Sequence, residues 1–371
     1  MTPEKLYIGL MSGTSLDGVD GVLVDFSDGR FRVLGHATAA LPQPLRETFH
    51  ALNQPGDNEL HRAALAGNAL AEVYGEVVRD LLKNCATPRN RVAAVGAHGQ
   101  TVRHLPRLDG RVGYTLQINQ PALLAELCGI DVIADFRSRD VAAGGQGAPL
   151  VPPFHEAVFG LAGEARAVLN LGGIANITLL GCAPDTPLTG FDCGPANTLL
   201  DLWFRQHHKG DFDADGAWAR TGRVHPGLMA AFQAEPFFHL LGPKSTGRDL
   251  FNAKWLQDHV ERFDAISAQD VQATLAELSA WAVAHAMEGS AAATVIVCGG
   301  GVRNSFLMER LGGLMPERKL EASDAWGLPA QQVEACAFAW LARQHDQGHM
   351  ASNPEVTGAR GARVLGARYP A

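Results

Sequence analysis

The chain has 371 residues, which is enough for two or three domains or for the two lobes of one enzyme. Hydrophobic residues make up 46% of the chain and charged residues 19%, so the composition excludes a disordered protein. The formal net charge of -8 argues against a nucleic-acid partner, and no apolar run reaches the ~18 residues of a membrane helix, so we expect no membrane association.

Two features of the sequence predict where the protein works. The apolar stretch near the N-terminus is interrupted by Ser12, Gly13 and Asp17, so we do not expect a signal peptide. The six cysteines form no CxxC pair, which indicates reduced thiols without a disulfide framework or a zinc site. The sequence therefore predicts a cytoplasmic α/β enzyme.

The first half of the chain alternates strands with helices. Alternating or apolar runs predict strands over residues 6–11, 19–26, 31–38, 91–96 and 131–135. Apolar residues at helical spacing predict a long amphipathic helix over 60–85 and a second helix from Pro121 to Leu127. The Gly- and Pro-rich stretch 135–155 is expected to be an ordered loop between two lobes, and the segment Leu108 to Val112 a long loop to which we assign no function.

The second half begins as the first does, with a strand, a tight turn and a returning strand, which makes a weak internal repeat. Ser267 and Asp270 form a capping box at the start of a helix. Gly348 ends the last helix. The predicted strands are 167–170, 177–180 and 294–298; the predicted helices begin at Pro195 or cover 267–287, 305–314 and 329–347, and a partly extended tail follows over 356–371.

Three glycine-rich turns stand at the ends of predicted strands: MSGTSLDG, NLGGIAN and CGGGVRN. Converging backbone N–H groups hold phosphates well, and glycine lets the chain approach the ligand closely. In the first turn the hydroxyls of Ser12, Thr14 and Ser15 could add further donors. None of the turns matches the P-loop or the GxGxxG spacing, and each alone is more often a plain tight turn. Together they favour a nucleotide cleft.

Two acidic residues invite both a functional and a structural interpretation. Asp192, in GFDCGPAN, is either a general base at the cleft or the cap of the helix predicted to begin at Pro195. Glu334 lies in the apolar helix QQVEACAFAWLA, where burying an unpaired charge is costly. It is either an exposed helix residue or a cleft residue that hydrogen-bonds a polyhydroxylated ligand.

A second set of polar residues follows two of the predicted strands. His98 and Gln100, in AHGQTVRH, could line the same cleft, although a buried structural histidine is equally consistent with the pattern. Arg137 and Arg139 stand beside Asp140 and form either an internal ion pair or a clamp for a substrate carboxylate, for which the guanidinium fork is well shaped.

The chain resembles the anhydro-N-acetylmuramic acid kinases of the acetate and sugar kinase, heat-shock cognate and actin superfamily. The motifs that carry the resemblance are MSGTSLDGVD, GAHGQT, DFRSRDVAAGGQGAPLVP, NLGGIANIT, GFDCGPAN, the Glu334 helix and the tail VLGARYP. The resemblance implies two ribonuclease-H-like (actin-like ATPase) lobes around a central nucleotide cleft. The N-terminal lobe would be residues 1–135 joined by the tail 355–371, and the C-terminal lobe residues 136–354.

The resemblance also implies a set of site residues. Asp192 falls on the catalytic aspartate, and Glu334 on an acid that contacts the sugar. ATP would be bound by two phosphate loops and an adenosine motif, with residues Gly13, Thr14, Ser15, Leu16, Asp17, Gly18, Val19, Asp20, Gly172, Gly173, Asn176, Gly299, Gly300, Gly301 and Asn304. The substrate would be bound by Ser12, His98, Gln100, Arg137 and Glu334.

The implied reaction is the hydrolytic opening of 1,6-anhydro-N-acetylmuramic acid with phosphorylation of O6 by ATP. Its product is N-acetylmuramate 6-phosphate, in peptidoglycan recycling, and a homodimer is expected. Because the wider superfamily often has an acid where Asn170 stands here, the Mg²⁺ ligand is open, with Asp17, Asp20 and Asp192 as candidates. The alternatives are a kinase of the same fold for another small sugar or carboxylate, and a non-catalytic nucleotide-gated binding protein.

Overall fold

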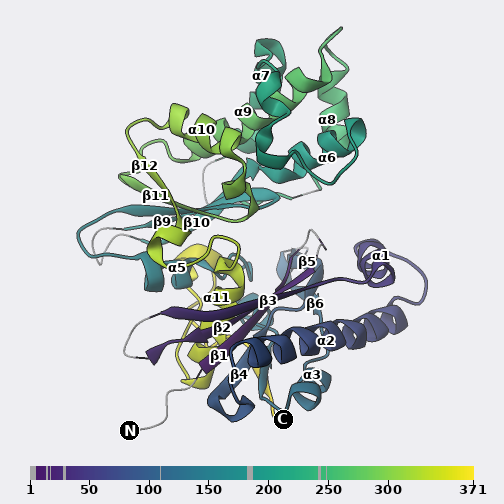
Figure 1. Ribbon diagram of the computed structural model, residues 1–371, viewed down its shortest axis with the longest axis vertical. Coiled ribbons are helices and arrows are strands. Elements are labelled where there is room, and N and C mark those ends of the chain that lie inside the picture. Colours follow the sequence, from purple (N-terminus) through teal and green to yellow (C-terminus); the bar gives the residue numbers. More distant parts are fainter. Residues whose placement is uncertain are drawn as a thin grey trace. The chain divides into compact units, whose positions relative to one another are not determined.

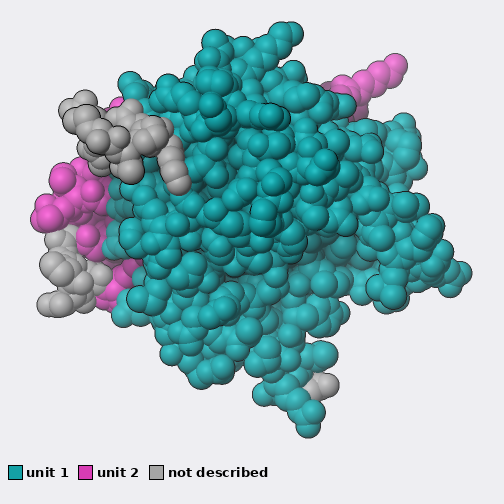
Figure 2. Space-filling view, turned by 90° about the horizontal axis from the view of Figure 1, so that it is seen from below, with its two compact units in different colours: residues 1–158, 332–371 teal, residues 159–331 magenta. Residues whose placement is uncertain are grey.

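The computed structural model describes residues 6–13, 16, 18–27, 31–108, 110–181, 187–240, 244–247 and 249–371. The chain divides into two compact units, residues 1–158 with 332–371 and residues 159–331, which Figure 2 colours separately. The sequence analysis expected the divisions after residues 135 and 354 instead. They differ because residues 136–158 and the helix α11 (Val333–Asp346) belong to the first unit, where α11 packs on the first sheet.

The first unit is built on a six-stranded sheet in the order β13-β7-β4-β1-β2-β3. Its strands are β1 (Leu6–Ser12), β2 (Gly18–Asp25), β3 (Arg32–Ala40), β4 (Val92–Ala97), β7 (Val132–Ala134) and β13 (Ala367–Tyr369). The helices are α1 (Gln43–Leu52), α2 (Glu59–Asn84), α3 (Pro121–Cys128), α4 (Ser138–Ala142), α5 (Pro152–Phe159), α11 and α12 (Pro354–Thr357). The strands β5 (Gln100–Leu108) and β6 (Arg111–Ile118) form a separate hairpin, so the expected long loop at Leu108 to Val112 is its turn.

Two helices cover opposite faces of this sheet (Figure 1). On one face, a Cβ placed on Gly21 would meet the side chains of Val77 and Leu81 from α2. On the other face, Gly9 of β1 lies directly against the backbone of α11. Successive side chains of a strand point to opposite faces, so Gly9 and its neighbour Leu10 face different helices. The sheet is therefore buried on both sides, which agrees with the nearly continuous apolar run of β1.

The second unit is built on a five-stranded sheet in the order β10-β9-β8-β11-β12. Its strands are β8 (Arg166–Leu171), β9 (Ile174–Leu180), β10 (Thr189–Pro195), β11 (Thr294–Cys298) and β12 (Lys319–Ala322). Its helices are α6 (Asn197–His207), α7 (Pro226–Gln233), α8 (Ala253–Val260), α9 (Ala268–Ala286) and α10 (Ser305–Leu314). Short 3₁₀ turns of the chain cover Arg89–Arg91, Ala214–Gly216, Ala219–Thr221, Pro236–His239, Gly300–Arg303 and Ser323–Trp326.

The two sheets share one topology. In each, the first three strands form an antiparallel meander, and two further strands add in parallel on the other side of the first strand. This 3-2-1-4-5 order with an antiparallel second strand is that of the ribonuclease-H-like fold. The weak repeat seen in the sequence is therefore a repeat of the whole sheet, and the predicted fold class is confirmed.

Most of the predicted strands and long helices are confirmed, with ends that move by a few residues. The capping box is confirmed, because the Ser267 side chain accepts a hydrogen bond from the backbone N–H of Asp270. The helix expected from Pro195 begins at Asn197, because β10 continues through Pro195. The analysis did not predict α1, α7 and α8, which are short. None of the helices in the described part of the chain has the length and hydropathy needed to cross a bilayer.

Candidate active site

In the first unit, the predicted site residues lie where parallel strands end. Ser12 is the last residue of β1, His98 follows β4 directly, and Arg137 comes shortly after β7. Ligands of open α/β sheets bind outside the carboxyl ends of the strands, so this edge is the expected place for a site. The sheet order thus brings together residues that are far apart in the sequence.

The loop between β1 and β2 is described in part, since Thr14, Ser15 and Asp17 lie outside the described residues. The carbonyl of Gly13 accepts a hydrogen bond from the N–H of Leu16. The side chains of Leu16 and Val19 are buried in the core. These two residues can therefore offer a nucleotide their backbone groups but not their side chains.

Ser12 and Gln100 satisfy each other. The Ser12 hydroxyl donates a hydrogen bond to the Gln100 side-chain oxygen, and both side chains are almost completely buried. Sequence reasoning assigned both residues to the substrate. The structure shows that they join the end of β1 to the start of the β5–β6 hairpin.

His98 is paired with Arg137. Its Nε2 atom accepts from the Arg137 guanidinium, at 3.2 Å from Nε and 2.9 Å from Nη2. Because an arginine can only donate, Nε2 carries no proton, and His98 is a neutral imidazole protonated on Nδ1. Burial, with the Arg137 charge, lowers the pKa of His98 to about 3. The ring also packs on Phe338 of α11, with centroids 4.7 Å apart.

Arg137 is held by uncharged acceptors. Besides His98, it donates to the carbonyl of Gly147 at 2.8 Å. Asp140 accepts instead from the Gly147 N–H and the Thr357 hydroxyl, both at 2.8 Å, so the internal ion pair is not formed by these groups. Burial lowers the pKa of Arg137 to about 10, while Glu334 acts to raise it. The guanidinium thus keeps its charge at neutral pH with no carboxylate bonded to it.

Glu334 stands in the first turn of α11. Its side chain is exposed to solvent, as the structural interpretation predicted. Its surroundings nevertheless raise the pKa of the Glu334 carboxyl through burial, Arg137 acts to lower it, and Asp20 acts to raise it. Both readings therefore hold in part, since the carboxylate is open to solvent and coupled to Arg137 and Asp20.

In the second unit, four polar side chains occupy one row across the sheet. Cys298 pairs with Asn170, Asn170 with Asn176, and Asn176 with Asp192. Side chains directly opposite on neighbouring strands have Cβ atoms about 4.5–5.5 Å apart. Asp192 is the only acid of this row, and two neutral amides stand beside it.

The side chain of Asp192 is held by a segment that the sequence analysis missed. Its Oδ2 atom accepts from the Ser245 hydroxyl and from the N–H of Thr246, each at 2.9 Å. Burial raises the pKa of Asp192, and these two hydrogen bonds lower it. The first helical turn of α6 has no side-chain cap, so the interpretation of Asp192 as a helix cap is wrong. No local pattern links KSTG (244–247) with residue 192; its small donor residues were the available signal.

The Gly172–Gly173 turn joins β8 to β9 and meets the start of α6. The carbonyl of Gly172 accepts from the N–H of Asn197, and that of Gly173 accepts from the N–H groups of Ala196 and Thr198. The carbonyls of the turn are therefore occupied. Its N–H groups are the part of the turn that could hold an anion.

The third glycine run follows β11. Gly299 has φ +85°, and a Cβ on it would lie 2.3 Å from Oδ1 of Asn170. Glycine is required here because the run passes so close to β8. Asn304 caps α10, because its Oδ1 atom accepts from the N–H of Leu307 at 3.0 Å. The Asn304 oxygen assigned to adenosine is thus already used within the protein.

The two buried histidines make a prediction about acid stability. Burial lowers the pKa values of His98 and His155 to about 3, below the ordinary value near 6.5. Below about pH 6.5 the unfolded chain binds protons that the folded chain does not, so stability falls with pH, by up to about 1.4 kcal/mol per pH unit for each histidine. Urea unfolding at pH values from 7 to 5 measures this slope, and His155→Asn should make it shallower. An unchanged slope in that variant contradicts the prediction.

Two ribonuclease-H-like units in one chain, with glycine-bearing turns and polar side chains at the strand ends, define the class of actin-like ATPases and sugar kinases. The particular family follows from comparison with known proteins. A family model described as anhydro-N-acetylmuramic acid kinase matches residues 5–371, so the chain belongs to that family. It is therefore an enzyme of the phosphotransferase class.

Curated relatives agree with this assignment. The anhydro-N-acetylmuramic acid kinase of Albidiferax ferrireducens is 56% identical, with 99% of this chain and 100% of the relative covered. That of Variovorax paradoxus is 58% identical, with 99% of each chain covered. Among solved structures, a reductive activator for a corrinoid, iron–sulfur protein overlays with a TM-score of 0.48 at 14% identity, covering 93% of this chain and 61% of that one.

Proposed function

We propose that the protein is an ATP-dependent kinase that opens 1,6-anhydro-N-acetylmuramic acid with water and phosphorylates O6, giving N-acetylmuramate 6-phosphate and ADP in peptidoglycan recycling. Membership of the family over residues 5–371 supports this activity. The structural observation that carries the mechanism is the Asp192 carboxylate, fixed through one oxygen at the end of the second sheet.

The role of Asp192 follows from the chemistry of the substrate. In the anhydro sugar, O6 is bonded to C1 and carries no proton, so a base has no acceptor hydroxyl to activate. Asp192 instead takes a proton from the water that attacks C1. As the new C1–O bond forms, the C1–O6 bond breaks, and O6 attacks the γ-phosphorus of ATP while ADP leaves. Sugar, water and ATP thus balance the product, ADP and one proton.

Residues of the first unit are proposed to bind the sugar. Arg137 has a full positive charge bonded to neutral acceptors, which suits the carboxylate of the lactyl group. Glu334, exposed and coupled to Arg137, would accept hydrogen bonds from the hydroxyl or amide groups of the sugar. His98 supports Arg137, and the buried pair of Ser12 and Gln100 shapes the same strand end.

The nucleotide is assigned to the glycine turns. The N–H groups of the turns at Gly13 and at Gly172–Gly173 are the proposed donors to the phosphates, and the Gly299–Gly301 run the proposed adenosine contact. Phosphoryl transfer asks the protein mainly for such positioning and for charge neutralisation.

Magnesium would be held by Asp20. In the described residues no group of three His, Cys, Asp or Glu side chains could hold a metal ion. Mg²⁺ uses one or two carboxylates with phosphates and waters, however, and the Asp20 side chain is 47% exposed. Asp192 fits this role less well, because its Oδ2 is already taken by two donors. When bound, the ion would supply charge neutralisation at the phosphates.

The location and assembly of the protein complete the proposal. ATP as the phosphoryl donor places the reaction in the cytoplasm. We also propose a homodimer, which sedimentation of the purified chain would test.

The proposed activity is tested in ¹⁸O-labelled water with ATP, Mg²⁺ and the anhydro sugar. Mass spectrometry should find a product that has gained one phosphate and one water, with the heavy oxygen at C1. Heavy oxygen in inorganic phosphate, with the sugar unchanged, would reduce the protein to an ATPase.

Glu334→Ala should weaken sugar binding more than nucleotide binding. The loss of a hydrogen bond to a charged group costs about 1.5–3 kcal/mol, so we expect the Kd for the sugar to rise about 10- to 100-fold. Calorimetric titrations with the sugar and with a non-hydrolysable ATP analogue measure both constants. Equal weakening of the two would remove Glu334 from the sugar site.

A further inference from the structure

The segment 244–247 surrounds Asp192 with hydrogen bonds. The N–H of Asp192 donates to the carbonyl of Lys244 at 2.9 Å, so the segment runs beside β10 at this point. The Ser245 hydroxyl and the Thr246 N–H then both donate to the same carboxylate oxygen, Oδ2. Among the hydrogen bonds of the described residues, none is assigned to Oδ1 of Asp192. One oxygen is held, and the other is left to act.

Both ends of this segment are anchored. Upstream, the Lys244 ammonium donates to the carbonyls of Phe237 and Phe238, each at 3.1 Å, and lies over the ring of Phe237. Lys244 is thus used as an anchor within the second unit. Phe238 itself packs against Gly194 of β10, where a Cβ would lie 2.7 Å from its ring.

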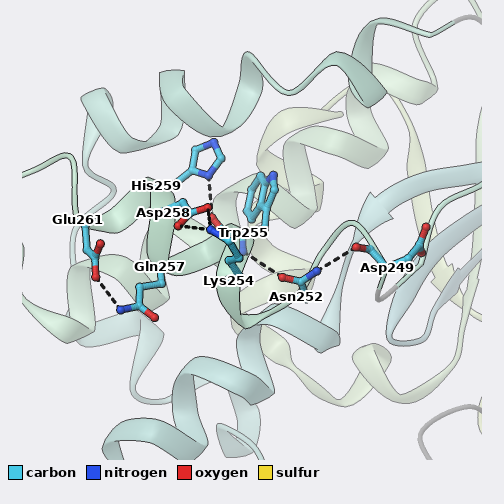
Figure 3. A network of polar contacts seen from close by, with 8 residues as sticks. All are labelled: Asp249, Asn252, Lys254, Trp255, Gln257, Asp258, His259 and Glu261. Atoms are coloured by element: carbon cyan, nitrogen blue, oxygen red, sulfur yellow. Dashed lines mark hydrogen bonds and ion pairs between the residues drawn. The ribbon is translucent and has the colours of Figure 1, made fainter. Parts of the chain in front are cut away.

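Downstream, the segment leads into α8. The carbonyl of Gly247 accepts from the N–H of Phe251, whose side chain is completely buried. Asn252 caps α8 through the N–H of Trp255 and donates to the carbonyl of Asp249 (Figure 3). Lys254 and Asp258 add an ion pair one turn further along the helix. A segment tied to β10, to two phenylalanine carbonyls and to a capped helix holds its donors in place.

We propose that Ser245 is a positioning residue for the general base, orienting the Asp192 carboxylate so that Oδ1 faces the water that attacks the sugar. This inference rests on the proposed function of Asp192. Ser245 touches neither water nor sugar in this role; it acts through Asp192. The Thr246 N–H gives the second point of attachment, and two donors on one oxygen fix the plane of the carboxylate as one donor cannot.

The charges around Asp192 agree with this assignment. Lys244 and Cys193 are the neighbouring groups that interact electrostatically with this site, and burial lowers the pKa of Lys244 and raises that of Cys193. Asn176, opposite Asp192 in the sheet, is neutral. The hydrogen bonds of the clamp therefore keep the base ionised in a place where burial opposes its charge.

The test compares Ser245→Ala with a matched control. Ser245 is exposed, so its truncation leaves the core intact. We expect kcat to fall about 10- to 100-fold, with both KM values within about twofold, because the lost hydrogen bond is to a charged group. The acid limb of the kcat profile should move to higher pH, because removing a donor raises the pKa of Asp192. Ser245→Thr should restore most of kcat.

Ser27→Ala is the control. Ser27 also gives a hydroxyl and an N–H to one carboxylate, that of Asp25, in the first unit. Its loss removes the same kind of hydrogen bond and should leave kcat and the pH profile unchanged. Wild-type kcat and an unmoved acid limb in Ser245→Ala, with Asp192→Asn inactive, would overturn the positioning role alone. If Asp192→Asn is itself active, the proposed function fails first.

Discussion

Asp192→Asn should bind both substrates and form almost no phosphorylated sugar. The amide keeps the shape of the carboxylate, and its oxygen can still accept from Ser245 and Thr246, so the local structure is retained. An amide cannot take the proton of the attacking water, however. General-base catalysis contributes about 10²–10⁴-fold, and we expect a loss of kcat in that range. Product formation by mass spectrometry and the Kd values by calorimetry measure the two effects separately.

A control separates this effect from a change of overall charge. Asp80 is exposed on α2 in the first unit, and Asp80→Asn removes one negative charge far along the chain from the site. It should keep the kcat of the unaltered protein. Turnover of Asp192→Asn at the same level would take residue 192 out of the reaction.

Much of the fold was predictable because it is encoded locally. The strand–turn–strand openings of both halves are short apolar runs around glycine, and the capping box of α9 is a pattern within four residues. Asp192 could be singled out because it follows a strand and precedes a Gly-Pro step. Such signals need no knowledge of what lies opposite in space.

The partners of the site residues could not be predicted in the same way. Ser245 lies 53 residues from Asp192, and Arg137 lies 39 residues from His98. These contacts exist because strand order places distant segments at one sheet edge, and the single sequence carries no signal for that pairing. The expected boundary after residue 354 fails for the same reason. Only the packing of α11 on β1 and β4 shows that this helix returns to the first unit.

That packing leads to the prediction with the largest expected effect on stability, for Gly9→Ala. Gly9 of β1 and Gly96 of β4 are paired in the sheet and lie against α11. A Cβ on Gly9 would lie 1.9 Å from the carbonyl oxygen of Ala335 and 2.5 Å from the N of Ala339. These are backbone atoms, so relief requires a shift of the whole helix or of the strand.

We expect Gly9→Ala to lower stability by about 3 kcal/mol or more, at the upper end of the cost of overpacking. For a unit of this size that corresponds to a fall in Tm of about 6–12 °C, which calorimetry or circular dichroism would detect. Because α11 carries Glu334 in its first turn, the displaced helix should also raise the KM for the sugar more than that for ATP. Both effects have one cause, the close contact between glycine and helix.

Gly312→Ala is the matched control for this prediction. Gly312 lies in α10, and a Cβ there would meet no atom within 4 Å. Alanine is favoured over glycine inside a helix by about 1 kcal/mol, so this variant should be slightly more stable than the unaltered protein. The two substitutions add the same methyl group and differ in what it meets. If Gly9→Ala melts at the same temperature as Gly312→Ala, helix α11 is not seated on the glycine pair, and the placement of Glu334 that depends on that seat fails with it.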